Sequence, residues 1–336
     1  MVIKVGINGF GRIGRLFYRA VIESGVKVDI VAINDLTSAE TNAHLLLYDS
    51  VHGKLKNKVS VKDGNIIVDG KKIKVYAEPE PSKIPWGDVG VHTVVECTGR
   101  FREKGSSAKH LEAGASKVLI SAPAKGVDAT IVPGVNDGVY DPEKHSVISL
   151  ASCTTNCLAP MVKVLNDAFG IENGLMTTVH SYTNDQRLLD MQHNDIRRAR
   201  AAASNIILTT TGAASAIGLV LPELTGKLNG LAMRVPVTNV SVTDLIVTLK
   251  SPASADEVNS AYMEASNGSL RDILAFTEEP LVSSDYIHNP HSVTIDGLST
   301  MATGNLVKVI GWYDNEWGYS CRMAWMVQRM GELEGL

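Results

Sequence analysis

Cysteine is scarce in this chain. Only four occur in 336 residues, at Cys97, Cys153, Cys157 and Cys321. Their spacing matches neither a disulfide-rich scaffold nor the paired CxxC pattern of a structural zinc site. So few cysteines in a long chain fit a reducing compartment. We therefore expect a cytoplasmic protein with no bound metal.

The chain also lacks an excess of positive charge. Its 32 Lys and Arg residues are outnumbered by 36 Asp and Glu residues, which gives a formal net charge of −4. A protein of this charge has no bulk positive field to attract nucleic acid or an anionic membrane. We therefore expect small-molecule partners, with neither nucleic acid nor membrane among them.

No segment has the pattern of a signal peptide or a membrane span. The first ten residues, MVIKVGINGF, lack signal-peptide architecture. The longest uncharged run, 201–222, is long enough to cross a bilayer but contains many polar residues, including Asn205 and the threonines 209–211. We interpret this run as a loop that is buried or faces another subunit.

The length and the balanced composition, with 44% hydrophobic and 20% charged residues, predict about two globular domains. In the first half, short apolar segments alternate with helical spacing. Such alternation predicts a doubly wound parallel sheet. The predicted helix covers 12–24, and the predicted strands cover 3–7, 28–33, 91–97, 117–121 and 129–132.

The pattern changes near residue 150. We expect a helix that Ser152 caps and that begins at Cys153, with a bend or an irregular first turn because Pro160 removes one helical hydrogen bond. Strands then dominate, and their alternation predicts a mostly antiparallel sheet with one buried face. The predicted strands are 175–182, 230–235, 240–249 and 307–312, and a helix over 319–334 follows them.

A glycine-rich turn follows the first strand. Gly9, Gly11 and Gly14 form a G-x-G-x-x-G that opens the first helix. Asp35 lies 21 residues after Gly14, at the end of the second strand. This is the context of a dinucleotide-binding loop, in which the helix start holds the pyrophosphate and the acid binds the ribose hydroxyls. The carboxylate would repel a 2′-phosphate, which favours NAD over NADP. A glycine turn in a nucleotide-free domain is the alternative.

Cys153 and His180 form a candidate catalytic pair. Cys153 would lie in the first turn of its helix, where the helix dipole stabilises a thiolate. His180 lies at the end of the strand that returns beside that helix, within reach of the thiol as a base. Each residue could instead be structural, since a free cysteine usually packs as a small apolar side chain.

At these residues the chain resembles the phosphorylating glyceraldehyde-3-phosphate dehydrogenases of bacterial type. The resemblance spans almost the whole chain in ordered motifs. They include INGFGRIGR (7–15), AINDL (32–36), SCTTNCLAP (152–160), TTVHSYTNDQ (177–186), RRARAAA (197–203), TTTGAA (209–214), MRVPVTNVS (233–241) and WYDNEWGYS (312–320).

The resemblance implies a role for each matching position. Cys153 would be the nucleophile and His180 its base. The implied cofactor contacts are Gly9, Gly11, Arg12, Ile13, Gly14, Asp35, Ser121, Asn184 and Asn315. Asn315 would orient the nicotinamide carboxamide. The implied sites for the substrate phosphate and inorganic phosphate comprise Ser152, Cys153, Thr154, Thr183, Arg198, Thr211, Gly212 and Arg234.

The resemblance also implies a fold and a reaction. The expected fold is a Rossmann-type NAD-binding domain over 1–151, joined by the C-terminal helix 316–336, and an α+β catalytic and oligomerisation domain over 152–315. The expected reaction converts D-glyceraldehyde 3-phosphate, NAD and inorganic phosphate to 1,3-bisphosphoglycerate, through a Cys153 hemithioacetal and thioester. The family implies a homotetramer and a place in glycolysis.

One departure bears on the cofactor. Gln192 stands where the family usually has a proline, in a segment that lies near the adenosine ribose of a neighbouring subunit in the family tetramer. Gln192 could hydrogen-bond a 2′-phosphate, so we expect NAD with NADP as a minor cofactor.

Three alternative functions remain. Erythrose-4-phosphate dehydrogenase shares the thiol chemistry, but the triose enzyme is favoured by 181–183 and 209–212. A 2-hydroxy-acid dehydrogenase leaves Cys153 without a role. A non-catalytic binding protein leaves the intact Cys153, His180 and Arg234 unexplained.

Overall fold

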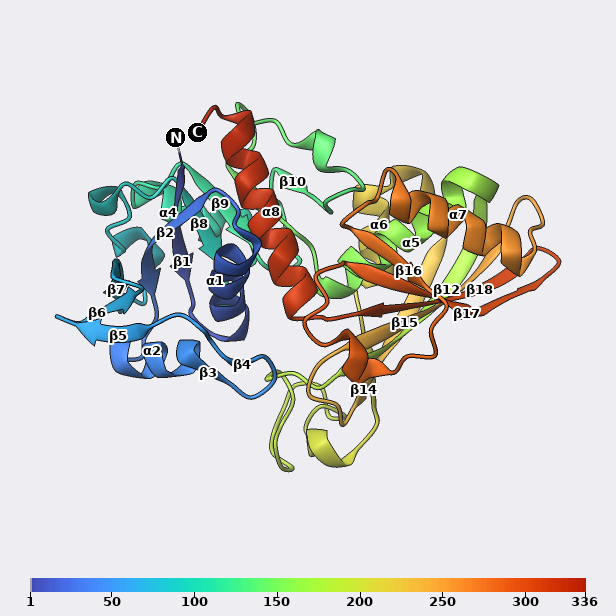
Figure 1. Cartoon of the computed structure of the whole chain (residues 1–336), viewed down its shortest axis with the longest axis horizontal. Helices are drawn as coiled ribbons and strands as arrows, with labels where there is room; N and C mark the ends of the chain where they lie inside the picture. Colours follow the sequence, from blue (N-terminus) through green and yellow to red (C-terminus); the bar gives the residue numbers. More distant parts are fainter. Residues whose placement is uncertain (1) are drawn as a thin grey trace. The chain divides into compact units, whose positions relative to one another are not determined.

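The computed structural model describes residues 2–336, which divide into two compact units. Unit 1 consists of 1–131, 137–152 and 320–336, and unit 2 consists of 132–136 and 153–319. Figure 1 shows unit 1 built around the blue and cyan strands and unit 2 around the yellow and orange ones. Each unit therefore has its own sheet and its own core.

Unit 1 contains a nine-stranded sheet. Its strands from β10 to β7 pair in parallel, and β6 and β5 are added as an antiparallel edge. In spatial order they are β10 (Ala129–Thr130), β11 (Val147–Ser149), β9 (Lys117–Ile120), β8 (Thr93–Glu96), β1 (Ile3–Asn8), β2 (Val28–Asn34), β7 (Lys71–Tyr76), β6 (Asn65–Val68) and β5 (Val59–Lys62). The predicted doubly wound parallel sheet is confirmed.

Helices flank this sheet, and a small hairpin follows one of them. They are α1 (Arg12–Ser24), α2 (Ala39–Leu47), α3 (Lys104–Ser107), α4 (Lys109–Glu112) and most of α8 (Trp317–Leu333), with the hairpin formed by β3 (Tyr48–Asp49) and β4 (Gly53–Lys54). The helix α1 presents Leu16, Phe17 and Ala20 to the core. Apolar residues at these spacings lie on one face of a helix, so the sequence pattern explains why α1 packs on the sheet.

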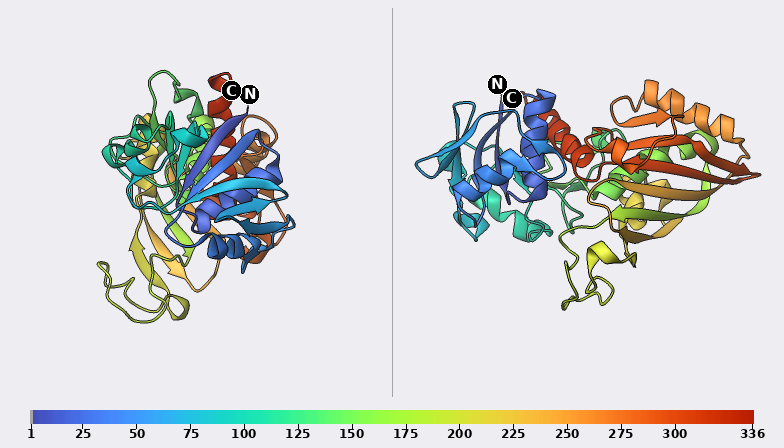
Figure 2. Two further views of the ribbon diagram at one scale, coloured as in Figure 1. Left: turned by 90° about the vertical axis from the view of Figure 1, so that its left-hand side faces the viewer. Right: turned by 60° about the horizontal axis from the view of Figure 1, so that its bottom comes forward.

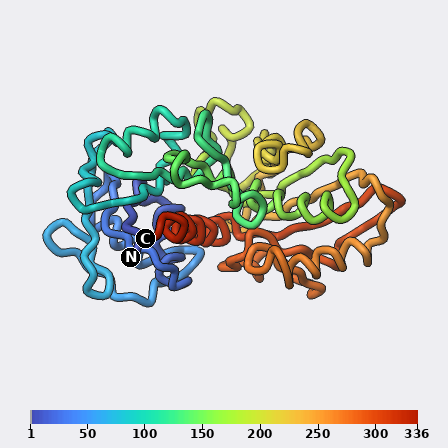
Figure 3. The backbone as a smooth tube through the Cα atoms, turned by 90° about the horizontal axis from the view of Figure 1, so that it is seen from above, coloured from blue at the N-terminus to red at the C-terminus, as the bar shows by residue number. Residues whose placement is uncertain are grey.

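The last helix packs beside the first strand. A Cβ atom added to Gly331 of α8 would lie 3.2 Å from the Ile3 side chain of β1. Near the same end, Glu334 accepts a hydrogen bond from Tyr140 Oη at 2.8 Å and lies 3.0 Å from His92 Nε2. Figure 3 shows this red helix next to the blue start of the chain. The first and last elements of the sequence are therefore neighbours in unit 1.

Unit 2 contains a seven-stranded sheet that is mostly antiparallel, as predicted. Only the β14–β12 and β17–β16 pairs are parallel. In spatial order the strands are β13 (Ile207–Thr210), β14 (Leu228–Val235), β12 (Ile171–Ser181), β15 (Ser241–Leu249), β18 (Leu306–Tyr313), β17 (Val293–Thr303) and β16 (Leu274–Thr277).

One face of this sheet carries the helices of unit 2. They are α5 (Cys153–Phe169), α6 (Ala213–Val220) and α7 (Ala255–Asn267), and Figure 1 shows them above the strands. Residues of β15 alternate between buried and more exposed positions, which gives the sheet one buried face. The predicted helix is confirmed as α5, which is assigned without a break from Cys153 to Phe169 and contains Pro160.

The uncharged run 201–222 is not a loop, and that interpretation was wrong. It contains the strand β13 and the helix α6. The helix is apolar on several sides, and Ala213, Ile217 and Val220 are buried. Packing inside unit 2 therefore accounts for part of this run, while Ile206 and Leu219 remain exposed. Within residues 2–336, no helix is both long enough and apolar enough to cross a membrane.

Candidate active site

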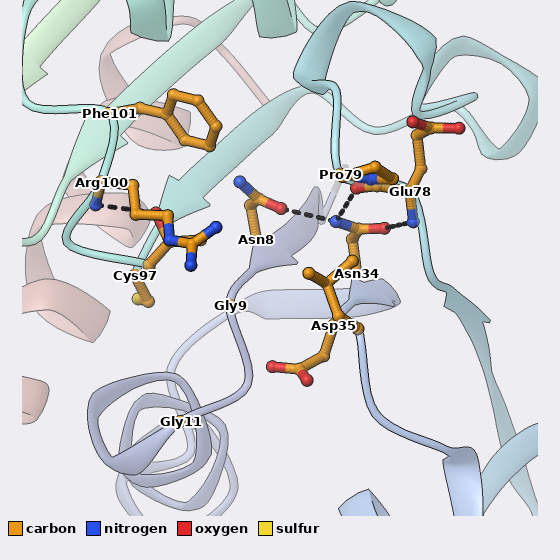
Figure 4. Close-up of a pocket in the computed structure, with 12 residues that line it drawn as sticks. Asn8, Gly9, Gly11, Asn34, Asp35, Glu78, Pro79, Cys97, Arg100 and Phe101 are labelled. Carbon is orange, nitrogen blue, oxygen red and sulfur yellow. Dashed lines mark hydrogen bonds between the residues drawn. The ribbon is translucent and has the colours of Figure 1, made fainter.

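A cavity of about 270 Å³ lies in unit 1 where β1, β2 and β8 end. The carboxyl ends of parallel strands are where α/β sheets bind nucleotides. The lining includes Gly9, Gly11 and Asp35, and Figure 4 shows the Asp35 carboxylate beside the glycine turn. Further lining residues are Asn8, Asn34, Leu36, Glu78, Pro79, Cys97, Thr98, Arg100 and Phe101.

The glycines of the turn have distinct local requirements. Gly9 has a φ of +89°, and a Cβ atom there would lie 2.7 Å from the Thr98 backbone nitrogen. A Cβ atom on Gly14 would collide with the Gly9 carbonyl oxygen. Gly11 has no neighbour within 4 Å of that position, and it lines the cavity. The turn is therefore closed on its protein side and open on its cavity side.

Asp35 is held in a fixed position at the cavity. Its Oδ2 atom accepts a hydrogen bond from the Phe10 backbone N–H at 2.8 Å, and its Oδ1 atom accepts one from Thr37 N–H at 3.1 Å. Both carboxylate oxygens thus have backbone donors that fix the side chain. The remaining lone pairs are available to hydroxyl groups of a ligand.

Arg12 and Ile13 form the first turn of α1. The Arg12 guanidinium forms an ion pair with Asp49. Burial alone would raise the pKa of Asp49, but N–H donors from His52 and Val51, together with the Arg12 charge, lower the pKa to about 2. Ser121 is also predicted to contact the cofactor. It follows β9, and its hydroxyl donates a hydrogen bond to the backbone carbonyl oxygen of Glu96 at 2.9 Å.

Polar residues that line this cavity, and the buried Glu96 that is hydrogen-bonded to two of them, were missed from the sequence. Asn8 and Asn34 end the apolar strands β1 and β2, and the Asn34 amide donates to Asn8 Oδ1 at 2.8 Å. Glu96 ends β8 and accepts hydrogen bonds from Asn8 Nδ2 at 2.6 Å and from Thr98 N–H at 2.7 Å. A single polar residue at the carboxyl end of each buried strand is the signal that could have identified them.

The thiol and the imidazole meet in unit 2. Cys153 begins α5 and His180 lies near the end of β12, and Cys153 Sγ is 3.6 Å from His180 Nε2. This distance is within the limit for a hydrogen bond that involves sulfur. The sequence prediction that these two side chains are adjacent is therefore matched by their geometry.

Arg234 lies on the other side of the imidazole. The parallel register of β12 and β14 pairs His180 with Arg234. The Arg234 Nη1 atom lies 2.6 Å from His180 Nδ1 and donates to the Ser181 carbonyl at 3.0 Å. That carbonyl also lies 2.7 Å from His180 Nδ1. Adjacent parallel strands thus place a cation directly beside the candidate base.

Burial and charge determine the protonation of this pair. Burial first, and then the Arg234 charge, lower the pKa of His180 to about 3. Burial raises the pKa of the Cys153 thiol, and the Arg234 charge partly offsets this. Burial thus favours the uncharged form of each side chain, the neutral imidazole and the thiol.

Two other groups near the thiol, Cys157 and Tyr313, are buried and have polar partners within unit 2. Cys157 lies one turn further along α5, is buried, and has its Sγ atom 3.4 Å from Thr243 Oγ1. Burial raises the pKa of Cys157 well above that of an ordinary thiol. The Tyr313 hydroxyl lies 3.0 Å from Thr154 Oγ1 and 2.8 Å from Thr178 Oγ1. Thr154 is thus bonded inside unit 2.

The remaining predicted anion-binding residues lie in turns and at helix starts. Arg198 donates to Thr209 Oγ1 at 2.8 Å and forms ion pairs with Asp185 and Asp195. Thr211 and Gly212 precede α6, and the Thr211 hydroxyl accepts from Ala213 N–H at 3.2 Å. Thr183 and the exposed Asn184 lie in the turn after β12, and Ser152 directly precedes α5.

Asn315 lies between β18 and α8 and is buried. Its side-chain oxygen accepts hydrogen bonds from the hydroxyls of Ser181 and Ser241. Among residues 2–336, no group of three or more His, Cys, Asp or Glu side chains is arranged to hold a metal ion.

A cavity at the glycine-rich turn and a cysteine–histidine pair in one chain are typical of an oxidoreductase that uses a nicotinamide cofactor. Comparison with family models gives the particular family. The NAD binding domain of glyceraldehyde 3-phosphate dehydrogenase matches residues 3–104, and the C-terminal domain of the same family matches residues 152–315. The chain belongs to the glyceraldehyde 3-phosphate dehydrogenase family.

Individual relatives agree with this. The chain is 61% identical to glyceraldehyde-3-phosphate dehydrogenase of Geobacillus stearothermophilus, over 96% of both chains. It is 62% identical to glyceraldehyde-3-phosphate dehydrogenase 1 of Bacillus subtilis strain 168, again over 96% of both chains, and 60% identical to the Priestia megaterium enzyme over 98% of both. The expected family, its NAD-binding domain and its oxidoreductase class are confirmed.

Proposed function

We propose that this chain oxidises D-glyceraldehyde 3-phosphate with NAD and inorganic phosphate to give 1,3-bisphosphoglycerate, a reaction of glycolysis. The observation that carries the proposal is the 3.6 Å separation of Cys153 Sγ and His180 Nε2 in a chain that also has a dinucleotide cavity. Neither feature alone selects the reaction. Together they supply a nucleophile, a base and a hydride acceptor.

Cys153 is the nucleophile and His180 the base of the first half-reaction. His180 Nε2 accepts the thiol proton, and the sulfur adds to the aldehyde carbon. The imidazolium then gives that proton to the resulting oxyanion, which produces the hemithioacetal hydroxyl and restores the neutral imidazole. The same imidazole then removes the hydroxyl proton of the adduct while hydride leaves the carbon. The backbone N–H of Cys153 and the protonated His180 stabilise the oxyanion. The product of this half-reaction is a thioester on Cys153.

The second half-reaction needs inorganic phosphate near the thioester. Arg234 and Arg198 supply local positive charge in a protein whose net charge is −4. Arg234 is 2.6 Å from the catalytic imidazole, which supports a place close to the reacting carbon. Hydroxyl and backbone N–H groups complete the two anion sites, contributed by Ser152, Cys153, Thr154, Thr183, Thr211 and Gly212.

The NAD cofactor supplies a nicotinamide ring that accepts hydride. The open side of Gly11 and the fixed Asp35 carboxylate fit its pyrophosphate and adenosine ribose. We assign further contacts to Gly9, Arg12, Ile13, Gly14, Ser121, Asn184 and Asn315. NADP would be a minor cofactor, because its 2′-phosphate would lie beside the Asp35 carboxylate.

The proposed assembly is a homotetramer in the cytoplasm. Support comes from the segment 182–206, which extends away from the sheet of unit 2 in Figure 2. The side chains of Leu188 and Ile196 in this segment are each 82% exposed, and Leu189, Met191 and Ile206 are exposed too. Apolar side chains gathered in one protruding segment are typical of a subunit interface. We propose 1–151 with 316–336 as the NAD-binding domain and 152–315 as the catalytic and oligomerisation domain.

A cofactor-reduction assay tests the activity. NADH formation from glyceraldehyde 3-phosphate should require phosphate for sustained turnover and should exceed the rate with erythrose 4-phosphate. Cys153→Ser should abolish the activity, because an alcohol gives no accessible anion at neutral pH. Cys157→Ser is the matched control and should lose far less. Equal loss in both variants, or a preference for the longer sugar, would contradict the proposal.

A further inference from the structure

The backbone around Asn315 is held by its neighbour. Asp314 Oδ1 accepts hydrogen bonds from the N–H groups of Glu316 at 3.0 Å and Trp317 at 2.7 Å, at the start of α8. Asp314 Oδ2 accepts from His288 N–H at 2.8 Å. These contacts fix the path of the chain through residue 315. The backbone of Asn315 is therefore fixed, and the direction of its amide depends only on the side-chain torsion angles.

Two serines hold the oxygen end of the Asn315 amide. Ser181 Oγ lies 3.0 Å and Ser241 Oγ 2.9 Å from Asn315 Oδ1. Both serines are fully buried on the adjacent strands β12 and β15. In such a site each hydroxyl proton needs an acceptor, because an unpaired polar group is costly away from water. The amide oxygen is the acceptor for both.

The direction of these hydrogen bonds follows from a third one. The Ser181 backbone N–H donates to Ser241 Oγ at 3.1 Å. A backbone N–H can only donate, so Ser241 Oγ is the acceptor there and its own proton is left for Asn315 Oδ1. A flipped amide would present N–H groups to the two hydroxyls and remove the acceptor of both protons. One of the two amide orientations is thus selected.

The nitrogen end of the amide is left without a partner. Asn315 is only 6% exposed, and within residues 2–336 its Nδ2 atom has no hydrogen bond. The group offers two N–H donors and no acceptor in its free direction. A ligand group that meets it must therefore carry an acceptor such as a carbonyl oxygen.

We propose that Ser181 and Ser241 are positioning residues that hold Asn315 as a pure donor to the carboxamide oxygen of the nicotinamide ring. This rests on the proposed function, in which Asn315 faces that ring. The serines would thereby select cofactors whose pyridine ring carries a carbonyl at position 3. A 3-acetylpyridine analogue keeps the acceptor, whereas an analogue with an unsubstituted pyridine lacks it.

Binding measurements test the proposal without turnover. Isothermal titration calorimetry would give the Kd of NAD and of ADP-ribose, which lacks the nicotinamide ring. For Ser181→Ala we expect the Kd of NAD to rise about 3- to 10-fold, the scale of one hydrogen bond, and that of ADP-ribose to change less than about 2-fold. The Kd of the 3-acetylpyridine analogue should rise in Ser181→Ala as much as the Kd of NAD does. The Kd of the unsubstituted analogue should be the same for the unmodified protein and the variants.

The controls separate this proposal from the proposed function. Ser292→Ala removes another buried serine hydroxyl of unit 2, one without a hydrogen-bond partner, and should leave both Kd values unchanged. Asn315→Ala should raise the Kd of NAD and leave the Kd of ADP-ribose unchanged. If it does not, the assigned role of Asn315 fails. If it does, but Ser181→Ala and Ser241→Ala bind NAD like the unmodified protein, the positioning role of the serines is overturned. Normal ADP-ribose binding shows that a variant is folded.

Discussion

His180 is an imidazole between a thiol and a guanidinium. Its Nε2 atom faces Cys153 Sγ, and its Nδ1 atom lies near both Arg234 Nη1 and the Ser181 carbonyl. When Nδ1 carries the proton, the carbonyl accepts it and Nε2 is free to act as the base. When the imidazole takes up the thiol proton, it becomes a second positive charge next to Arg234. Repulsion between these two cations disfavours the protonated form. An anion bound at Arg234 would relieve that repulsion.

Acid should unfold the protein partly through His180. The pKa is about 3 in the folded protein and near 6.5 in an ordinary histidine, so between these values the unfolded chain binds the additional proton. The free energy of unfolding therefore rises with pH across this window and falls as pH is lowered, by up to about 1.4 kcal/mol per pH unit. Urea midpoints between pH 4.5 and 7 should show a shallower pH dependence for His180→Asn than for the unmodified protein. Parallel curves would refute the assignment.

Cofactor choice should depend on two residues that act in opposite directions. The Asp35 carboxylate repels a 2′-phosphate, whereas the exposed Gln192 amide contributes a neutral hydrogen bond of about 0.5–1.5 kcal/mol at most. Repulsion should win, so NAD is preferred. Asp35→Ala should narrow or reverse the ratio of kcat/KM for NAD and NADP, and Gln192→Pro should sharpen it. An unmodified enzyme that prefers NADP would show that Asp35 does not decide the choice.

Most individual positions at the site could be predicted because they stand in local motifs. Gly9, Gly11 and Asp35 stand in the spacing of a dinucleotide-binding loop, and Cys153 and His180 stand in motifs that resemble those of the family. The clamp of Ser181 and Ser241 on Asn315 could not be predicted, because it joins residues up to 134 positions apart through the register of β12 and β15. Arg234 beside His180 is likewise a consequence of the parallel β12–β14 pairing.

Among the elements, the glycine turn and α1 act as one structure. Gly14 packs against the turn itself, and Gly11 faces the cavity. The two glycines therefore serve different purposes, one for the packing of the helix on the turn and one for the approach of a ligand. A methyl group added at Gly14 should therefore affect the stability of the fold, and one added at Gly11 should affect the affinity for NAD.

Gly14→Ala should lower the stability of the fold, because its Cβ atom would collide with the Gly9 carbonyl. Overlap of this kind typically costs about 1–3 kcal/mol. Gly11→Ala meets no protein atom within 4 Å, so its thermal midpoint should stay close to that of the unmodified protein while its affinity for NAD falls. Thermal unfolding and calorimetric titration of both variants measure this. The reverse pattern would mean that the turn does not face the cofactor.

The elements with strong periodicity were predicted well, and those without it were missed. The predicted helix 12–24 matches α1, and the strands of the parallel core lie where the apolar runs stand. The hairpins of β5, β6 and β7 were missed, because lysines interrupt their apolar pattern at positions 62, 71, 72 and 74. The helix α6 was taken for a loop, because its many small and apolar residues give it no polar face.

At the scale of the whole molecule, the segment 182–206 of unit 2 exposes several large apolar side chains to solvent. Its leucine and isoleucine residues, Leu188, Leu189, Ile196 and Ile206, are between 67% and 82% exposed. Burial of such side chains against other subunits contributes roughly 25 cal/mol per Å² of apolar surface. A single chain would leave this area in water, which favours association.

The homotetramer should therefore depend on this segment. Light scattering at micromolar concentration should give a mass of about four times 36.0 kDa. Leu188→Glu combined with Ile196→Glu should reduce that mass, because charges would be buried at the interface. Leu333→Glu, at the exposed end of α8, is the control and should leave the mass unchanged. A monomeric unmodified protein would defeat the proposed assembly.

The contact between α8 and β1 also has a consequence for the order in which a newly made chain can fold. Residues 153–319 leave the ribosome before 320–336, yet the last segment is a helix that packs beside the strand formed by the first residues. Domains usually fold as units in the order of synthesis. Here the second unit can finish while the first still lacks the helix beside Ile3. Unit 1, although it contains the earliest residues, is thus complete only after the last residues have been made.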